Sequence, residues 1–204
     1  MGKFVTFEGG EGAGKSTLLS NLHEKLNQMN VDYVFTREPG GLKLCEDIRN
    51  ILKYSKEKMS VRTELLLFSA SRAQLVEEYI KPKLAEGKVV FCDRFFDSTR
   101  VYQGYANGIA DESVMEVTNF ACEGLTPDVT FFLDIDPVVA FKRKGGQDKG
   151  DRIEERDMSF HQKVRDGYKM IAEKEPRFVV LDATLSPETL VELVIDKLKK
   201  ENII

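Results

Sequence analysis

The stretch GGEGAGKST, residues 9–17, has the spacing G-x-x-x-x-G-K-[ST]. Such a loop holds a phosphate tail with converging backbone N–H groups, and glycine permits both the close approach and the positive φ angles that this requires. The lysine would reach the β- and γ-phosphates, and the serine hydroxyl would bind Mg²⁺. The alternative is a glycine-rich surface turn. We predict a nucleotide triphosphate site with Mg²⁺ as its metal, formed by Gly10, Glu11, Gly12, Ala13, Gly14, Lys15, Ser16 and Thr17.

The residues on either side of this loop favour the phosphate-binding interpretation. Lys3–Glu8 alternates between apolar and polar residues like a strand, and Leu18, Leu22, Leu26 and Met29 recur at helical spacing. A strand, a loop and a helix in this order are what the motif needs, because the free N–H groups and the dipole of the first helical turn add to an anion site.

Length and charge limit the possible organisation and partners. A chain of 204 residues is enough for one sizeable domain, although length alone would also permit two small ones. We find no internal repeat, linker or low-complexity tract, so we expect a single domain over residues 1–204. The net charge of -4 gives no reason to expect nucleic acid as a partner, because duplex-binding surfaces are usually basic.

The cysteines and the apolar segments indicate a cellular compartment. Cys45, Cys92 and Cys122 are odd in number, widely separated and form no C-x-x-C pair, so we expect neither a zinc site nor disulfides but three small buried side chains. The sequence passes from Met1 directly into the first predicted strand, and no apolar run is long enough to span a bilayer. We therefore expect a cytoplasmic protein without a membrane partner.

Strand-like and helical segments alternate along the chain, which is typical of parallel strands joined by crossover helices. We predict a doubly wound α/β fold, a three-layer α/β/α sandwich around a parallel five-stranded sheet. Asp111 is the expected N-cap of a helix over Glu112–Glu123, and Asp136 and Ser186 are expected to cap later helices. The predicted strands are Phe4–Phe7, Tyr33–Thr36, Val89–Cys92, Thr130–Asp134 and Phe178–Leu181.

Arginines follow several of these strands. Ligands of such sheets collect beyond the carboxyl ends of the strands, and the arginine fork matches phosphate oxygens. Each arginine alone is more often a surface ion-pair partner, but together they favour a second phosphorylated ligand that faces the first and receives a phosphoryl group. The candidates are Arg37, Arg49, Arg72, Arg94, Arg143, Arg152 and Arg156.

The last three of these arginines lie in a stretch of charged and glycine residues, about 143–156. This composition cannot hold a packed core, so one interpretation is a disordered surface loop. We favour a lid that closes over phosphate, because a lid excludes the water that would otherwise accept the phosphoryl group.

Five elements together resemble the thymidylate kinase family, of the bacterial type with arginines in its lid. They are FEGGEGAGKST, TREPGG, LLLFSASR, DRFFDSTRVYQGYA and DRIEERD, and the similarity runs from Phe4 to about Asp182. The resemblance implies phosphorylation of dTMP to dTDP with ATP and Mg²⁺. It also implies a homodimer, for which the apolar faces of Ser60–Glu86 and Glu112–Glu123 are candidates, with ordinary core packing as the alternative.

The resemblance also implies how dTMP is held. Glu11 would accept a hydrogen bond from the 3′-hydroxyl, Phe68 would stack on thymine, and Arg72 would read the O4 atom of the base. Gln103 would face the base as well. The implied acceptor pocket comprises Glu11, Arg37, Glu38, Pro39, Arg49, Phe68, Arg72, Arg94, Ser98, Tyr102 and Gln103, with Arg37 and Arg49 as the clamps on its phosphate.

The implied catalytic groups are Lys15, Arg94, Arg152 and Asp93, with Ser16 and Asp93 near the metal. Gly12 occupies a position where some members carry a γ-phosphate-binding arginine. The D-R-I-E element assigns this role to Arg152, with Arg143 as a further ATP-binding group and Arg156 as another alternative.

Some alternatives stay open at this stage. Arg100 departs from the family pattern, and it either adds a cation near the acceptor or points to solvent. Another P-loop nucleotide or nucleoside kinase would share most of these features. A nucleotide-dependent switch protein is the alternative from another class, although the N/T-K-x-D element that reads guanine is missing.

Overall fold

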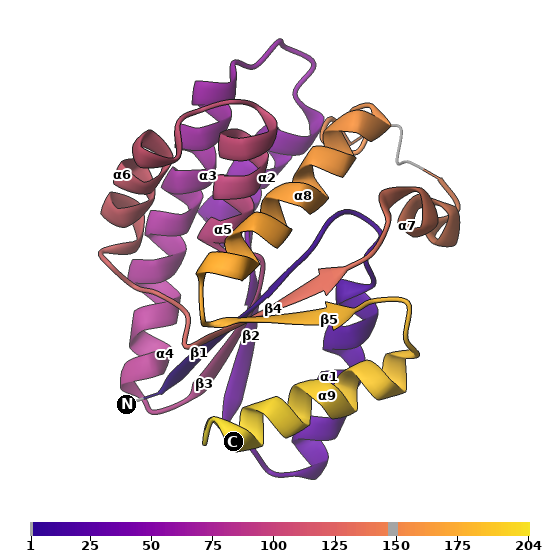
Figure 1. Ribbon diagram of the computed structural model, residues 1–204. Helices are drawn as coiled ribbons and strands as arrows, with labels where there is room; N and C mark the ends of the chain where they lie inside the picture. Colours follow the sequence, from indigo (N-terminus) through magenta and orange to yellow (C-terminus); the bar gives the residue numbers. More distant parts are fainter. Residues whose placement is uncertain (1, 147–150) are drawn as a thin grey trace.

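Five parallel strands form the middle of the molecule in the order β2-β3-β1-β4-β5 (Figure 1). This computed structural model describes residues 2–146 and 151–204, so residues 147–150 of the predicted lid lie outside the described residues. All five predicted strands are confirmed to within one residue at each end. They are β1 (Lys3–Glu8), β2 (Tyr33–Arg37), β3 (Val89–Asp93), β4 (Val129–Asp134) and β5 (Phe178–Asp182).

Helices fill the intervals between the strands. The helices are α1 (Lys15–Gln28), α2 (Lys43–Tyr54), α3 (Val61–Leu75), the π-helix η1 (Val76–Ile80), α4 (Lys81–Ala85), α5 (Phe96–Thr99), the π-helix η2 (Arg100–Ala106), α6 (Asp111–Cys122), α7 (Pro137–Lys144), α8 (Met158–Lys174) and α9 (Pro187–Lys200). The predicted long helical stretch over Ser60–Glu86 thus corresponds to α3, η1 and α4 in direct succession.

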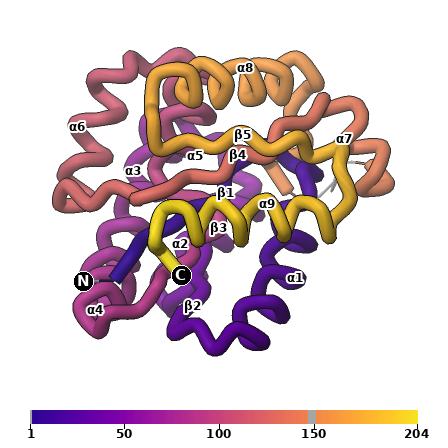
Figure 2. The backbone as a smooth tube through the Cα atoms, turned by 60° about the horizontal axis from the view of Figure 1, so that its bottom comes forward, coloured from indigo at the N-terminus to yellow at the C-terminus, as the bar shows by residue number. Residues whose placement is uncertain are grey.

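The sheet has helices on both faces, which confirms the predicted three-layer sandwich (Figure 2). Alternate side chains of a strand point to opposite faces. In β1, Val5 and Phe7 pack with α1 and α9, whereas Phe4 packs on the other side with η1 and α4. A further cluster around Phe132 and Tyr168 attaches α8 and η2 to the second face.

Side-chain caps fix where several helices begin. The Asp136 side chain accepts a hydrogen bond from the N–H group of Val138, and Pro137 occupies the first turn of α7. Ser186 caps α9 in the same way, so both of these predictions are confirmed. The prediction for Asp111 is wrong: α6 begins at Asp111 itself and its N-cap is Ala110. The Asp111 carboxylate instead binds Arg100, because a charged guanidinium offers a stronger partner than the free N–H groups of the helix.

The three cysteines are free and buried, as expected for small apolar side chains. Over residues 2–146 and 151–204, none of the helices combines the length and the apolarity that a membrane crossing requires.

Candidate active site

The P-loop connects β1 to α1 at the carboxyl edge of the sheet. Gly12 and Gly14 adopt φ angles of 72° and 91°, which side chains with a Cβ atom rarely adopt. A Cβ atom on Gly12 would also lie 2.7 Å from the backbone oxygen of Ala140. The positive φ angles agree with the prediction for this loop, and the structure adds that Gly12 permits the close approach of α7.

Lys15 points back into the loop that precedes it. Its Nζ atom donates to the backbone oxygens of Gly9 at 3.2 Å and Gly10 at 3.5 Å. Burial and the nearby charge of Arg94 lower the pKa of Lys15, while the carboxylate of Asp93 opposes this shift. Within the described part of the chain, the hydrogen bonds of this buried ammonium group go to backbone carbonyls, which it can exchange for phosphate oxygens.

A cavity of about 780 Å³ extends from the P-loop along this edge of the sheet, a size typical of small-molecule sites. Predicted residues from both the ATP site and the acceptor pocket line this cavity. Its wall includes Glu11, Gly12, Ala13, Gly14, Lys15, Ser16, Thr17, Arg37, Glu38, Pro39, Arg49, Phe68, Asp93, Arg94, Ser98, Tyr102, Gln103 and Arg143.

Four of the candidate residues, Gly10, Arg72, Arg152 and Arg156, are not part of this wall. Gly10 borders a second, much smaller cavity beside α7. Arg72 is buried behind the wall, with 1% of its surface exposed. Arg152 lies against α2 and α3, and its contacts are described below.

Glu11 and Arg94, which both line the cavity, form an ion pair. The Arg94 Nη2 atom lies 2.6 Å from Oε1 of Glu11, and the Tyr102 hydroxyl donates to the same oxygen at 3.2 Å. Burial alone would raise the pKa of Glu11, but the charges of Arg94 and Lys15 outweigh it and lower this pKa to about 2. Glu11 is therefore a carboxylate at neutral pH.

Arg94 is held by the backbone and by a buried acid that the sequence analysis did not single out. Its Nη1 atom donates to the backbone oxygen of Gly9 at 2.8 Å and to Ser98 Oγ at 3.3 Å. Ser98 in turn donates to Glu8 at 2.6 Å, and Glu8 also accepts from Tyr168 at 2.8 Å. Burial raises the pKa of Glu8. The two hydroxyl groups donate to its Oε2 atom, and the Phe95 N–H group donates to its Oε1 atom at 2.8 Å. Glu8 thus ties the P-loop strand to the loop that carries Arg94.

Arg72 and Glu38 form a fully buried pair. Arg72 Nε donates to the Oε2 atom of Glu38 at 2.7 Å. Arg72 Nη2 lies 2.6 Å from the same oxygen. Burial raises the pKa of Glu38 to about 7, although the Arg72 charge opposes this. Arg72 Nη1 has no hydrogen-bond partner among the described residues. An orphaned donor of this kind is costly in a protein interior unless a bound group satisfies it.

Two further arginines lie near the mouth of the cavity on the β2–α2 side. Arg37 is exposed and pairs with Glu46 at 2.9 Å. Arg49 donates to the backbone oxygen of Pro39 at 2.9 Å. Both contacts leave guanidinium N–H groups available for an anionic ligand, because each guanidinium carries five such donors.

Asp93, at the end of β3, faces the cavity from beneath the P-loop. Its Oδ1 atom is buried and has no hydrogen-bond partner within residues 2–146 and 151–204. Asp93 acts on Lys15 through its charge, so the carboxylate lies near the place where a triphosphate would bind. A carboxylate oxygen without a protein partner fits a hydrated Mg²⁺ ion, which binds through few protein groups and keeps several waters.

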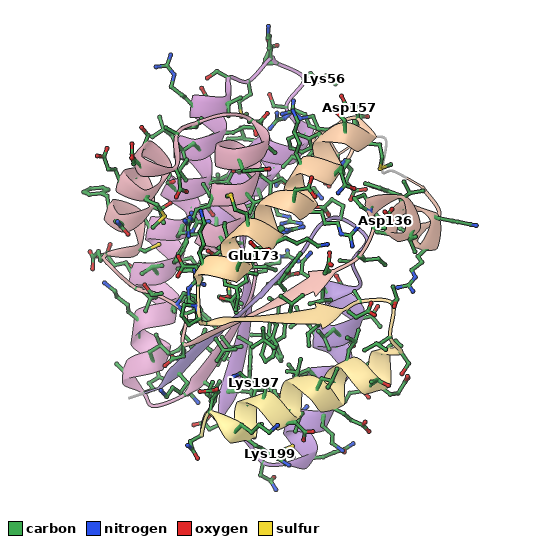
Figure 3. The ribbon with its side chains drawn as sticks, in the orientation of Figure 1. Lys56, Asp136, Asp157, Glu173, Lys197 and Lys199 are labelled. Atoms are coloured by element: carbon green, nitrogen blue, oxygen red, sulfur yellow. The ribbon has the colours of Figure 1, made fainter. Side chains whose placement is uncertain are left out.

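The residues after the undescribed segment fold back onto α2 and α3. Arg152 donates to the backbone oxygen of Leu52 from Nε and Nη2, at 3.2 and 3.1 Å, and to Glu64 from Nη1 at 2.8 Å. Lys53 and Asp151 form an adjacent ion pair at 2.7 Å. Figure 3 shows Lys56, in the α2–α3 loop, and Asp157, at the start of α8, at this same end of the molecule.

The other two lid arginines have separate contacts. Arg143 donates to the backbone oxygens of Ala183 at 2.6 Å and Thr184 at 3.4 Å. Arg156 donates to Asn107 and lies over the Phe160 ring at 4.6 Å. Only Arg143 of these two lines the cavity, on the side of the β5–α9 loop.

Arg100 neither lines the cavity nor points freely to solvent. It pairs with Asp111 at 2.9 Å and Glu175 at 3.1 Å, and its side chain is 14% exposed. The structure thus assigns Arg100 to a network that joins η2, α6 and the end of α8.

The sequence analysis missed one wall of the cavity. This wall comes from the β5–α9 loop and the start of α9, and it consists of Ala183, Leu185, Pro187 and Leu190. The rule that ligands collect beyond strand ends applies to β5 too, and it could have indicated these residues.

Known proteins resemble the chain over almost its whole length. A sequence model described as thymidylate kinase matches residues 7–194. Thymidylate kinase from Finegoldia magna is 45% identical over 98% of this chain and all of the relative. The enzyme from Lactobacillus acidophilus is 46% identical over 98% of this chain and 94% of the relative. The crystal structure of thymidylate kinase from Ehrlichia chaffeensis superposes with a TM-score of 0.81 at 35% identity, and it covers 98% of this chain and 100% of that chain.

Proposed function

The chain belongs to the thymidylate kinase family, and on that premise we propose that it transfers the γ-phosphoryl group of ATP to dTMP, giving dTDP. The observation that carries the proposal is one continuous cavity in which a P-loop faces arginines and an aromatic side chain from other strand-end segments. Phosphoryl transfer requires donor and acceptor in line and close together, with their charges neutralised. The two ends of this cavity supply these conditions.

At the donor end, the glycine loop and the start of α1 would hold the triphosphate of ATP. Lys15 would exchange its carbonyl partners, Gly9 and Gly10, for β- and γ-phosphate oxygens. The adenine ring would lie against the apolar residues of the β5–α9 loop, beside Arg143.

Mg²⁺ would bind between the Ser16 hydroxyl, the phosphates and the Asp93 carboxylate. Ser16 stands at the exposed start of α1, and the unpartnered Oδ1 atom of Asp93 supports this assignment. When bound, the ion would neutralise phosphate charge. Substituting Asp93 by asparagine should raise the Mg²⁺ concentration needed for half-maximal binding of ATP, which titration calorimetry measures without turnover.

At the acceptor end, the thymine ring would stack on Phe68, and Arg72 Nη1 would donate to its O4 atom. This contact would satisfy the orphaned donor of Arg72. Arg37 and Arg49 would hold the 5′-phosphate, and Glu11 would accept a hydrogen bond from the 3′-hydroxyl. Glu38, Pro39, Ser98, Tyr102 and Gln103 complete the pocket.

Arg94 lies between the two ends, where charge spreads over the phosphoryl group as it moves. Its bonds to Gly9, Ser98 and Glu11 hold the guanidinium in place before substrate arrives, so little reorganisation is needed during the reaction.

A contact between Arg152 and the γ-phosphate remains a prediction. It requires the guanidinium to exchange Glu64 and the Leu52 carbonyl for phosphate oxygens. Arg152→Ala would then lower kcat far more than it raises KM for dTMP. An unchanged kcat would remove Arg152 from the chemical step.

The direct experiment is a coupled assay that detects ADP, with ATP, Mg²⁺ and a series of acceptors. We expect dTMP to be used in preference to AMP and thymidine. Preferred turnover of AMP or thymidine would favour another nucleotide or nucleoside kinase. Slow hydrolysis of ATP that no acceptor accelerates would favour a switch protein.

We also propose that two copies associate through α3 and α6. Leu66 on α3 is 58% exposed and Phe120 on α6 is 87% exposed, which is costly for large apolar side chains at a free surface. We expect light scattering to give the mass of a dimer and Phe120→Asp to give a monomer. A monomeric native protein would contradict this part alone.

A single domain in the cytoplasm completes the proposal. The continuous cores on both faces of one sheet support a single folding unit, and the free cysteines fit a reducing compartment. Calorimetric unfolding in one cooperative transition would agree with the single domain, and two separated transitions would contradict it.

A further inference from the structure

Glu64, on α3, connects the end of the lid to the wall of the acceptor pocket. Its Oε1 atom accepts from Arg152 Nη1 at 2.8 Å, and its Oε2 atom accepts from Gln103 Nε2 at 3.3 Å. Glu64 is 4% exposed and Gln103 is 2% exposed. The sequence analysis did not single out Glu64, and the mechanism above does not use it.

The carboxylate determines which way the Gln103 amide points. A carboxylate only accepts hydrogen bonds, so the NH₂ end of the amide must face Glu64. The opposite end, Oε1, accepts no hydrogen bond from the described residues, and Gln103 lines the cavity. The amide therefore presents an acceptor, and not a donor, to a bound base.

Arg152 limits the freedom of Glu64 in turn. The guanidinium is itself held by two bonds to the Leu52 carbonyl. Until it turns to the γ-phosphate, it therefore keeps Oε1 of Glu64 in place and leaves Oε2 for Gln103. Because both the acid and the amide are buried, water cannot easily replace either contact.

We propose that Glu64 is a positioning residue that sets the selectivity for the pyrimidine base through Gln103. An acceptor at this position suits thymine, whose N3 atom carries a proton, and disfavours cytosine, whose N3 atom is itself an acceptor. The inference rests on the proposed function, since it places the base of dTMP beside Gln103. A pocket built to hydrogen-bond one ligand rejects an analogue that leaves its polar groups unpaired.

The test compares dTMP with 5-methyl-dCMP, which keeps the ring methyl group but inverts the donors and acceptors at positions 3 and 4. Glu64→Gln offers both a donor and an acceptor to Gln103, so the Gln103 amide can turn over. We expect the ratio of kcat/KM for dTMP to that for 5-methyl-dCMP to fall roughly tenfold, the effect of about one hydrogen bond. Arg72 is the same in both proteins, so the change in the ratio reports on the amide.

Two variants separate this role from a structural one. In a Gln103→Ala background, Glu64→Gln should leave the ratio unchanged, because the group through which it acts is gone. Glu78→Gln, an exposed substitution on η1, is the matched control and should keep the native ratio. The proposal would be overturned if folded Glu64→Gln kept the native ratio. It would also be overturned if Gln103→Ala/Glu64→Gln gave a lower ratio than Gln103→Ala alone.

Glu64→Gln leaves Arg152 without its charged partner and could unfold the protein. The variant Glu64→Gln/Arg152→Met removes both charges, and the ratio between two acceptors cancels any effect of Arg152 on ATP. We expect the same fall in the ratio there, and a native ratio would overturn the proposal. Failure of the proposed function looks different, since the native protein would then phosphorylate neither nucleotide.

Discussion

The two ends of the cavity are built in different ways. The donor end comes from one stretch, residues 9–17, and it acts through backbone groups and a single lysine. The acceptor end comes from side chains on the β2–α2 loop, α2, α3, the loop after β3 and η2. A local motif thus suffices for one end, whereas the other exists only once distant segments have packed together.

The acceptor end also differs in its charges, because most of its arginines already form an ion pair with a carboxylate. These pairs differ in burial: the side chains of Arg72 and Glu38 are 1% and 3% exposed, whereas those of Arg37 and Glu46 are 53% and 35% exposed. Exposed pairs contribute little to stability, but a buried charge without its partner is costly. Substitutions of charged residues should therefore lower the free energy of unfolding more at the acceptor end than at the donor end.

Removing the buried arginine should have the largest effect. Arg72→Met leaves the Glu38 carboxylate buried without its partner, and we expect the free energy of unfolding to fall by about 3–5 kcal/mol. Urea unfolding at pH 8 measures this loss, which includes the cost of protonating Glu38, because the Arg72 charge lowers the pKa of Glu38 and its removal raises that pKa further. Arg37→Ala is the matched control and should cost less than about 1 kcal/mol.

The double variant Glu38→Leu/Arg72→Met separates folding from binding. It removes both buried charges and should regain most of the lost stability, while phosphorylation of dTMP stays impaired. If Arg72→Met and Glu38→Leu/Arg72→Met had the same free energy of unfolding, the unpaired Glu38 carboxylate would not be the cause of the lost stability.

Loss of the lysine should affect the donor end alone. Lys15→Ala removes a phosphate contact made during transfer, and we expect kcat to fall by a factor on the order of 10²–10³. The dissociation constant for dTMP, measured by calorimetry without ATP, should stay within about twofold. A large loss of dTMP binding would mean that the two ends are not independent.

The same difference explains which features could be predicted from the sequence. The P-loop, the five strands and the caps Asp136 and Ser186 depend on neighbours in the chain, and all were identified from local patterns. Glu8 was missed because its partner Tyr168 lies 160 residues away. The error at Asp111 has the same origin, since Arg100 competes for its side chain through a tertiary contact.

The acceptor residues were named through family resemblance, because composition and spacing alone left each arginine ambiguous. Packing then decided what the pattern could not. It buried Arg72 behind the wall and placed Arg152 against Glu64. A sequence pattern specifies residue types, but the orientation of a long flexible side chain depends on all the segments that meet around it.

Loss of the Phe68 side chain should weaken only the binding of dTMP, and the effect should be smaller than that of Lys15→Ala on kcat. Phe68→Ala removes the proposed stacking on thymine, which is worth about 1–3 kcal/mol per base. We expect KM for dTMP to rise roughly fivefold to a hundredfold while KM for ATP is unchanged. Phe68→Tyr keeps the ring and should retain most of the affinity. A matching rise in KM for ATP would place Phe68 between the two ends instead.

Glu11 belongs to both ends, and its substitution should have the smallest effect. It lies in the P-loop, yet it pairs with Arg94 and is proposed to bind the sugar of dTMP. Its pKa is about 2 in the folded protein, below the ordinary value of 4.5. Its ionised form therefore stabilises the fold fully above pH 4.5, and this contribution is lost as the pH falls toward 2.

Urea unfolding of the native protein and of Glu11→Gln between pH 2 and pH 6 measures this contribution. The native protein should be the more stable above pH 4.5, by an amount on the order of 1 kcal/mol, because solvent reaches the 23% exposed side chain and weakens the pair. The difference should shrink as the pH approaches 2, and Glu24→Gln on α1 controls for the loss of one surface carboxylate. A difference that does not depend on pH would mean that Glu11 stabilises the loop by packing, and the charge link between the two ends would then be absent.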